Sequence, residues 1–240
     1  MHDAVIDIGN TRVKVALFDQ SGIAQQWTLP TVDIAMGLVP SLVPYRLGRA
    51  IVSNVGARTT EWLTALQEFV SVHVLSYRSR LPFETRYTTP QTLGLDRIAA
   101  VAAVAIDYPD RNCLVIDAGT CITYDILTKD RIHLGGNIAP GADMRLRAMH
   151  DYTAALPRVK RQRNVADYGY STDSALLAGA WGGALAEIEG FIARYEAQLG
   201  TLDVVMTGGD AAYFAPHLKK RIFARPDLVL HGLYQILLLQ

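Results

Sequence analysis

Residues 5–11 read VIDIGNT, an apolar run that ends in an Asp-x-Gly-Asn-Thr turn. A second stretch of the same kind, LVIDAGT, occupies residues 114–120. Each is followed by another strand-like segment, at residues 13–19 and 121–127. A turn that carries an acid, a glycine and a hydroxyl can bring backbone N–H groups close to phosphate oxygens. The repeat therefore predicts two related domains that face one phosphate-bearing ligand.

The composition allows a large buried core and gives the chain no net charge. It has 240 residues, half of them apolar, and a formal net charge of zero. We therefore do not expect it to coat nucleic acid, and its longest stretch of small apolar residues, 99–106, is too short to span a bilayer. The first residues show no secretory-signal pattern. Cys113 and Cys121 lack CxxC spacing and the histidines lack metal-ligand spacing, so we expect a cytoplasmic protein without a zinc site.

The order of expected strands and helices restarts in mid-chain, which predicts an α/β fold with mixed sheets flanked by helices. We expect a domain of residues 1–109 and a domain of residues 110–240, with a terminal helix at 228–239 that packs back on the first domain. The pattern predicts strands at 4–7, 13–19, 23–29, 49–54, 71–76, 114–117, 122–128, 130–134 and 204–207. Helices are expected at 59–70, 95–106, 142–150 and 173–199, and a glycine-rich loop from Gly135.

The first turn contains groups that suit a phosphate and a divalent cation. Gly9 permits close backbone approach, and the N–H groups near it, with the Thr11 hydroxyl, can donate to phosphate oxygens. Asp7 can hold Mg²⁺ through water, and Lys14 adds positive charge. For a single turn, an ordinary hairpin is the better explanation, because Asp, Gly and Asn are favoured turn residues.

The second turn and a third one change that balance. Asp117, Gly119 and Thr120 repeat the first pattern after a strand of the same type. Residues 207–210, Thr-Gly-Gly-Asp, then form a glycine-rich turn at another strand end, which can pass flat against an adenine or a ribose. The three turns in this order indicate a nucleotide site.

The set of motifs resembles the superfamily of acetate and sugar kinases, Hsp70 and actin, and within it the type III pantothenate kinases. The motifs are residues 7–11, 117–120, 135–141 and 207–209, together with Gly94-Leu95-Asp96-Arg97, and they span nearly the whole chain. The resemblance implies two ribonuclease-H-like domains with an ATP cleft between them. It also implies ATP-dependent phosphorylation of pantothenate to 4′-phosphopantothenate, the first step of coenzyme A biosynthesis, by a homodimer.

The resemblance also implies roles for individual residues. Asp96 is the expected catalytic residue, Asp117 the ligand of a monovalent cation (K⁺ or NH₄⁺), and Asp7 the ligand of Mg²⁺. The expected ATP-binding residues are Asp7, Ile8, Gly9, Asn10, Thr11, Arg12, Val13, Lys14, Thr120, Gly208 and Gly209. The expected substrate-binding residues are Tyr87, Gly94, Leu95, Asp96, Arg97 and Thr172.

Each substrate-site residue also has a structural alternative. Asp96 can accept the proton of an attacking hydroxyl, but it can equally cap the following helix. Arg97 can bind a carboxylate in a bidentate fork or form a surface salt bridge. Tyr87 is as well explained by packing of its loop. Thr172 competes with Ser171 for the N-cap of the long helix.

Two rival functions remain open from the sequence. A kinase for another small alcohol would keep the ATP turns but need a different acceptor site. A non-catalytic transcriptional regulator would find local support in the basic run of Arg158, Lys160, Arg161 and Arg163. A solvated connector explains that run better, because it lacks interleaved aromatic residues. Gly182 and Gly183 indicate either close helix packing, across a dimer or within the chain, or a kink.

Overall fold

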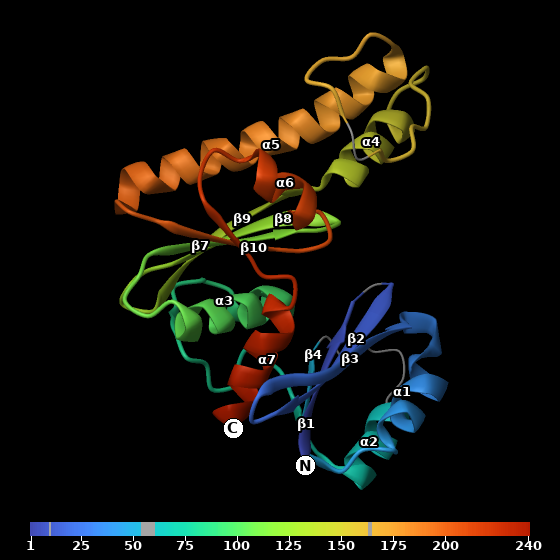
Figure 1. The fold of residues 1–240 in the computed structure, drawn as a ribbon, viewed down its shortest axis with the longest axis vertical. Coiled ribbons are helices and arrows are strands. Elements are labelled where there is room, and N and C mark those ends of the chain that lie inside the picture. Colours follow the sequence, from blue (N-terminus) through green and yellow to red (C-terminus); the bar gives the residue numbers. More distant parts are fainter. Residues whose placement is uncertain (10, 54–60, 163–164) are drawn as a thin grey trace. The chain divides into compact units, whose positions relative to one another are not determined.

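The protein is described from a computed structural model, which covers residues 1–9, 11–53, 61–162 and 165–240. The chain divides into two compact units (Figure 1). The first unit contains Met1–Pro109 together with Asp227–Gln240, and the second contains Asp110–Pro226. Each unit is built around a mixed β-sheet with helices packed on it, so the predicted α/β fold class is confirmed.

The first unit holds a five-stranded sheet in the order β3-β2-β1-β4-β5. Strands β1, β2 and β3 form the predicted antiparallel meander, and β4 and β5 continue the sheet in parallel. The strands are β1 (His2–Ile8), β2 (Arg12–Asp19), β3 (Gly22–Pro30), β4 (Leu47–Ser53) and β5 (Ser71–Val74), with a short β6 (Glu84–Thr85) later in the unit. The helices are α1 (Ile34–Leu42), α2 (Glu61–Phe69), α3 (Leu95–Asp107) and α7 (Leu228–Leu238), with single 3₁₀ turns at Thr31–Asp33 and Pro90–Thr92.

Side chains along these strands point alternately to the two faces of the sheet, and apolar residues are buried on both faces. One face, with Ile6, Val15 and Val52, packs against α1 and α2. The other face contacts α7, where the ring of Phe18 stacks on Tyr234 at 4.2 Å. Figure 1 shows α7, the last helix of the chain, lying between this sheet and α3. The C-terminal segment is therefore part of the core of the first unit.

The second unit repeats the pairing pattern of the first. Its strands follow the order β11-β10-β7-β8-β9, in which β7, β8 and β9 are antiparallel and β10 and β11 are parallel to β7. The strands are β7 (Cys113–Ala118), β8 (Cys121–Leu127), β9 (Ile132–Pro140), β10 (Asp203–Thr207) and β11 (Ile222–Ala224). The helices are α4 (Ala142–Asp151), α5 (Thr172–Leu199) and α6 (Ala211–His217).

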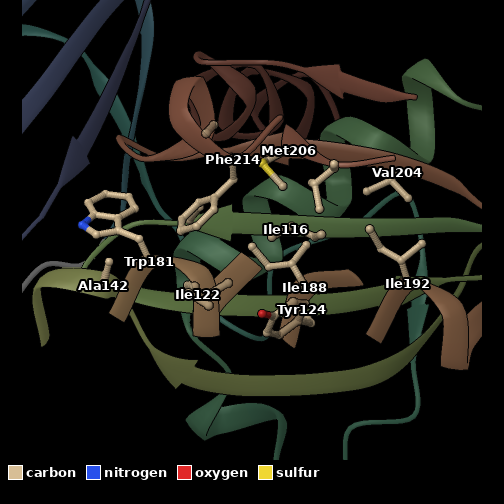
Figure 2. Packing of buried hydrophobic residues seen from close by; sticks show 14 of the residues in the cluster. Ile116, Ile122, Tyr124, Ala142, Trp181, Ile188, Ile192, Val204, Met206 and Phe214 are labelled. Carbon is tan, nitrogen blue, oxygen red and sulfur yellow. The ribbon is translucent and has the colours of Figure 1, made fainter. Parts of the chain in front are cut away.

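The long helix α5 forms one wall of the core of the second unit. Its inward residues recur at helical spacing, among them Trp181, Ile188 and Ile192, and they pack on the sheet residues Ile116 and Tyr124 (Figure 2). By length and composition α5 is the one described helix apolar enough to cross a membrane, with a mean hydropathy of 1.3. Its buried apolar residues pack on the sheet of the second unit, which makes it a core helix.

Several sequence expectations need correction or addition. The expected glycine-rich loop from Gly135 is strand, because β9 continues to Pro140 and pairs Gly135 and Gly136 with β8. Helix α1 was not predicted, since Gly37 and Pro40 lie inside it. Helix α6 and strand β11 were not predicted either, being 7 and 3 residues long. The beginning of the helix expected at 59–70 lies outside the described residues, and the remainder is α2.

We predict that Gly232→Ala destabilises the first unit. A Cβ atom at residue 232 of α7 would lie 1.7 Å from the carbonyl oxygen of Ala99 in α3, so the helices would have to move apart. The expected loss in free energy of unfolding is about 1–3 kcal/mol. The matched change Gly190→Ala in α5, where no heavy atom lies within 4 Å, should be neutral or stabilising by up to about 1 kcal/mol. Denaturant unfolding measures both, and equal stability of the two variants would contradict the close packing of α7 on α3.

Candidate active site

The first Asp-x-Gly turn is a tight connection between β1 and β2 in the first unit. The N–H of Gly9 donates to the carbonyl of Arg12 at 2.9 Å, and the hydroxyl of Thr31 donates to the carbonyl of Gly9 at 2.9 Å. Gly9 and Thr11 are exposed, so their polar groups are accessible to a ligand. Val13 is fully buried, so its side chain belongs to the core and only its backbone can face one. Asn10 lies outside the described residues.

The carboxylate of Asp7 occupies a desolvated position at the end of β1. It pairs in register with Lys14 of β2, and it accepts a hydrogen bond of 2.6 Å from the hydroxyl of Ser53 in β4. Burial raises the pKa of Asp7, the negative charge of Asp96 raises it further, and the Ser53 hydrogen bond and Lys14 oppose the rise. The charge of Asp96 therefore acts on Asp7, and the first phosphate motif and the expected catalytic residue belong to the same unit.

Ser53 was not among the predicted site residues. It is fully buried at the last position of β4, directly opposite Asp7 in the parallel register. The only signal in the sequence is a single hydroxyl at the carboxyl end of an apolar strand, which by itself does not distinguish a site residue from any strand end.

Asp96 lies in the first turn of α3 and is exposed to solvent. Gly94 takes the N-cap position, so Asp96 is not the N-cap residue. The Asp96 carboxylate nevertheless accepts a hydrogen bond of 2.9 Å from the N–H of Arg97. The positive end of the helix dipole lies beside this carboxylate. Of the two sequence interpretations, capping in the strict sense is wrong, and an accessible carboxylate held at a helix N-terminus is what the structure contains.

Arg97, the residue after Asp96, lies against Tyr87. Arg97 is only 5% exposed, and its guanidinium lies 5.6 Å from the centre of the half-buried Tyr87 ring. Arg97 is buried, so its side chain is not on the surface, as the salt-bridge alternative required. A cation over an aromatic face is attracted to it, which favours this placement of the guanidinium.

The second Asp-x-Gly turn resembles the first but is one residue shorter. In the second unit the N–H of Gly119 donates to the carbonyl of Cys121, two residues on, at 2.9 Å, whereas that of Gly9 donates to Arg12, three residues on. The third turn lies directly on it, because Thr207 pairs in register with Asp117. Gly208 has φ +95°, and a Cβ atom there would lie 2.4 Å from the Asp117 carboxylate. The residues at this end of β7 and β10 thus include Asp117, Thr120, Gly208 and Gly209.

Thr172 belongs to a different unit from the other substrate-site candidates. It is the first residue of α5 in the second unit, whereas Tyr87, Asp96 and Arg97 belong to the first. Ser171 is the N-cap residue and forms a capping box with Ser174. Thr172 is therefore not used as a cap, and its exposed position leaves its hydroxyl accessible.

No cluster of three or more His, Cys, Asp or Glu side chains suitable for a metal ion occurs among the described residues. Mg²⁺ does not need such a cluster when it is held by one or two carboxylates, several waters and substrate phosphates. Asp7, which lies beside the phosphate-type turn and is kept in place by Ser53, fits that kind of site.

Comparisons with known proteins agree on one family. The family model for type III pantothenate kinase matches residues 4–194. A type III pantothenate kinase of Bacteroides fragilis is 40% identical over 97% of this chain and 96% of its own length. One of Flavobacterium johnsoniae is 34% identical over 96% of this chain and 95% of its own length.

Solved structures share the fold. A protein of Campylobacter jejuni described as a Baf family transcriptional activator has a TM-score of 0.64 and 24% identity, covering 98% of this chain and 96% of its own. A protein of Listeria monocytogenes described as an N-acetylmannosamine kinase has a TM-score of 0.60 and 14% identity, covering 99% of both chains. The paired turns, the Gly94–Arg97 motif and the near full-length matches lead to one conclusion: this chain belongs to the type III pantothenate kinase family.

Proposed function

We propose that the chain transfers the γ-phosphoryl group of ATP to the hydroxyl of pantothenate, giving 4′-phosphopantothenate and ADP in the first step of coenzyme A biosynthesis. Family membership supports the reaction. The observation that carries it is the placement of an accessible carboxylate, Asp96, close enough to Asp7 of the first phosphate turn for their charges to interact. Phosphoryl transfer needs that combination of an anion-binding turn and a nearby proton acceptor.

Each unit offers groups that would suit the phosphates of ATP. In the first unit these are the backbone around Gly9, the Thr11 hydroxyl and the ammonium group of Lys14. In the second unit they are Thr120 and the Gly208–Gly209 turn, which would also face the adenosine. Mg²⁺, which Asp7 would hold through water, would neutralise part of the phosphate charge.

Asp96 and Arg97 would act on the acceptor. The pantothenate hydroxyl oxygen attacks the γ-phosphorus, the bond to the bridging oxygen breaks, ADP leaves, and the hydroxyl proton passes to Asp96. Arg97 would bind the pantothenate carboxylate through its planar guanidinium, already oriented by the Tyr87 ring. Thr172 would add a hydroxyl contact to the substrate.

Three further proposals follow from the family. Asp117 would hold a monovalent cation, K⁺ or NH₄⁺, beside the phosphates. The enzyme would act as a homodimer. It would work in the cytoplasm, in keeping with Cys113 and Cys121, which are both free thiols.

The reaction is tested by ADP release coupled to pantothenate, with Mg²⁺ and K⁺ present. Wild-type turnover should require pantothenate, and Asp96→Asn should lower kcat by about 10²–10⁴-fold, the usual contribution of a general base. Asp130→Asn, a matched change at an exposed turn residue, should leave kcat unchanged. Turnover with other alcohols but not with pantothenate would overturn the assignment of pantothenate as substrate. Near wild-type turnover of Asp96→Asn would show that Asp96 is not the base.

We predict that Asp7→Asn stabilises the protein while it abolishes Mg²⁺-dependent turnover. The pKa of Asp7 is raised above its ordinary value of 3.8 in the folded state, so ionising this carboxylate favours the unfolded chain and costs stability as pH rises past that value. Asparagine keeps the acceptor for Ser53 without the charge. The thermal midpoint at pH 7 should rise, by about 2–4 °C for each kcal/mol recovered.

The gain should shrink as pH falls toward 4, because Asp7 then becomes protonated in the wild type as well. Thermal melts of ligand-free wild type and Asp7→Asn at pH 4, 5, 6 and 7 measure this trend. A midpoint for Asp7→Asn below that of the wild type at pH 7 would show that the carboxylate is not held in a desolvated position.

A further inference from the structure

The connector between α4 and α5 carries a basic run in which one residue differs from the others. Arg158 and Lys160 form no ion pair within the described part of the chain, and Arg163 lies outside it. Arg161 instead contacts two carboxylates, Asp210 and Asp143, with 3.6 Å between its guanidinium and the Asp143 oxygen. Among the described residues of this basic run, Arg161 alone joins the connector to the body of the second unit by an ion pair.

The Asp210 carboxylate is the unusual member of this contact. Asp210 follows Gly208 and Gly209 directly, is 5% exposed, and occupies the N-cap position of α6. An aspartate at an N-cap ordinarily accepts a hydrogen bond from its own helix, but the Asp210 side chain makes no such bond. It accepts one from the Arg161 guanidinium instead. Burial raises the pKa of Asp210, and Arg161 counteracts that rise.

Arg161 is held in place by more than Asp210. Its guanidinium lies 4.9 Å from the ring centre of Trp181 in α5, and this ring packs on Tyr213 of α6 at 4.3 Å. Figure 2 shows Trp181 and Phe214, from α5 and α6, together at one end of the core. Groups from α4, α5 and α6 thus converge on a single arginine, which restricts its orientation.

The turn before Asp210 is fixed on its other side by the second Asp-x-Gly motif. The N–H of Asp210 donates to the carbonyl of Ala118 at 2.9 Å, and Gly208 lies against the Asp117 carboxylate. Residues 208–210 are therefore held between Ala118 on one side and Arg161 on the other. Without Arg161, a buried carboxylate would remain unpaired next to the place where we expect phosphates, and it would repel them.

We propose that Arg161 is a positioning residue for ATP: it neutralises Asp210 and holds the Gly208–Gly209 turn in the geometry that accepts the nucleotide. The inference rests on the proposed function, since it needs ATP to bind at this turn. Arg161 of the connector would then affect how tightly the nucleotide binds and would not take part in phosphoryl transfer to the acceptor. Its effect should therefore fall on the KM for ATP and leave kcat largely unchanged.

The test compares Arg161→Met with Arg158→Met, a change of the same type at an exposed arginine of the same connector. Arg161→Met should raise the KM for ATP and the Kd for Mg·ADP about tenfold, the scale of a lost hydrogen bond between a half-exposed guanidinium and a buried carboxylate. Its kcat and its KM for pantothenate should change less than about threefold. Arg158→Met should match the wild type. Arg161→Lys, which keeps the charge without the planar fork, should be intermediate.

Removal of the Asp210 charge should restore binding. The double variant Arg161→Met with Asp210→Asn should return the Kd for Mg·ADP to within about threefold of wild type, because the unpaired charge is gone. A purely structural loss would not be rescued in this way. A wild-type Kd in Arg161→Met, or no recovery in the double variant, would overturn the role of Arg161.

Titration with Mg·ADP separates this inference from the proposed reaction. If the wild type binds Mg·ADP but does not phosphorylate pantothenate, the proposed reaction fails while the Kd values still decide the role of Arg161. If the wild type does not bind Mg·ADP, both are overturned.

Discussion

Both sheets depend on a central strand that pairs antiparallel with one neighbour and parallel with the other. In the first unit this is β1, between β2 and β4, and in the second it is β7, between β8 and β10. The antiparallel neighbour forces a tight turn after the aspartate. The parallel neighbour ends at the same edge, so a hydroxyl residue lies in register with each aspartate: Ser53 beside Asp7, and Thr207 beside Asp117. Ligands of open α/β sheets bind at such carboxyl ends of strands.

The arrangement around Asp7 works against stability. A carboxylate in a desolvated position, close to a second carboxylate, is less favourable in the fold than in water. Ser53 and Lys14 offset only part of that cost. A cation bound beside Asp7, such as the Mg²⁺ of the proposed reaction, would reduce the repulsion between Asp7 and Asp96. Asp210 follows the same principle in the second unit, except that its partner, Arg161, is supplied by the protein itself.

How much the sequence predicts depends on whether the signal is local. The repeated turns, both meanders, α3 and α5 follow from periodicity and turn residues. The turns together with the Gly94–Arg97 motif carried the resemblance to the family. Ser53 could not be predicted because its meaning comes from register with Asp7, a contact between distant segments. The Gly135–Gly136 stretch is strand because pairing with β8 overrides a composition that favours loops. Helix α1 forms in spite of Gly37 and Pro40 because Ile34, Leu38 and Leu42 are buried on the sheet. The contact between Arg161 and Asp210 joins two loops, and no sequence pattern marks it.

The central claim is that each Asp-x-Gly turn is a phosphate-binding turn and that the Gly208–Gly209 turn takes part in nucleotide binding. Amide hydrogen exchange with Mg²⁺ and a non-hydrolysable ATP analogue tests it most directly, because exchange reports each segment separately. We predict slower exchange at residues 7–14, 117–120 and 207–210 together, at the same analogue concentration. Protection at only one of the two Asp-x-Gly turns, or none at 207–210, would contradict it.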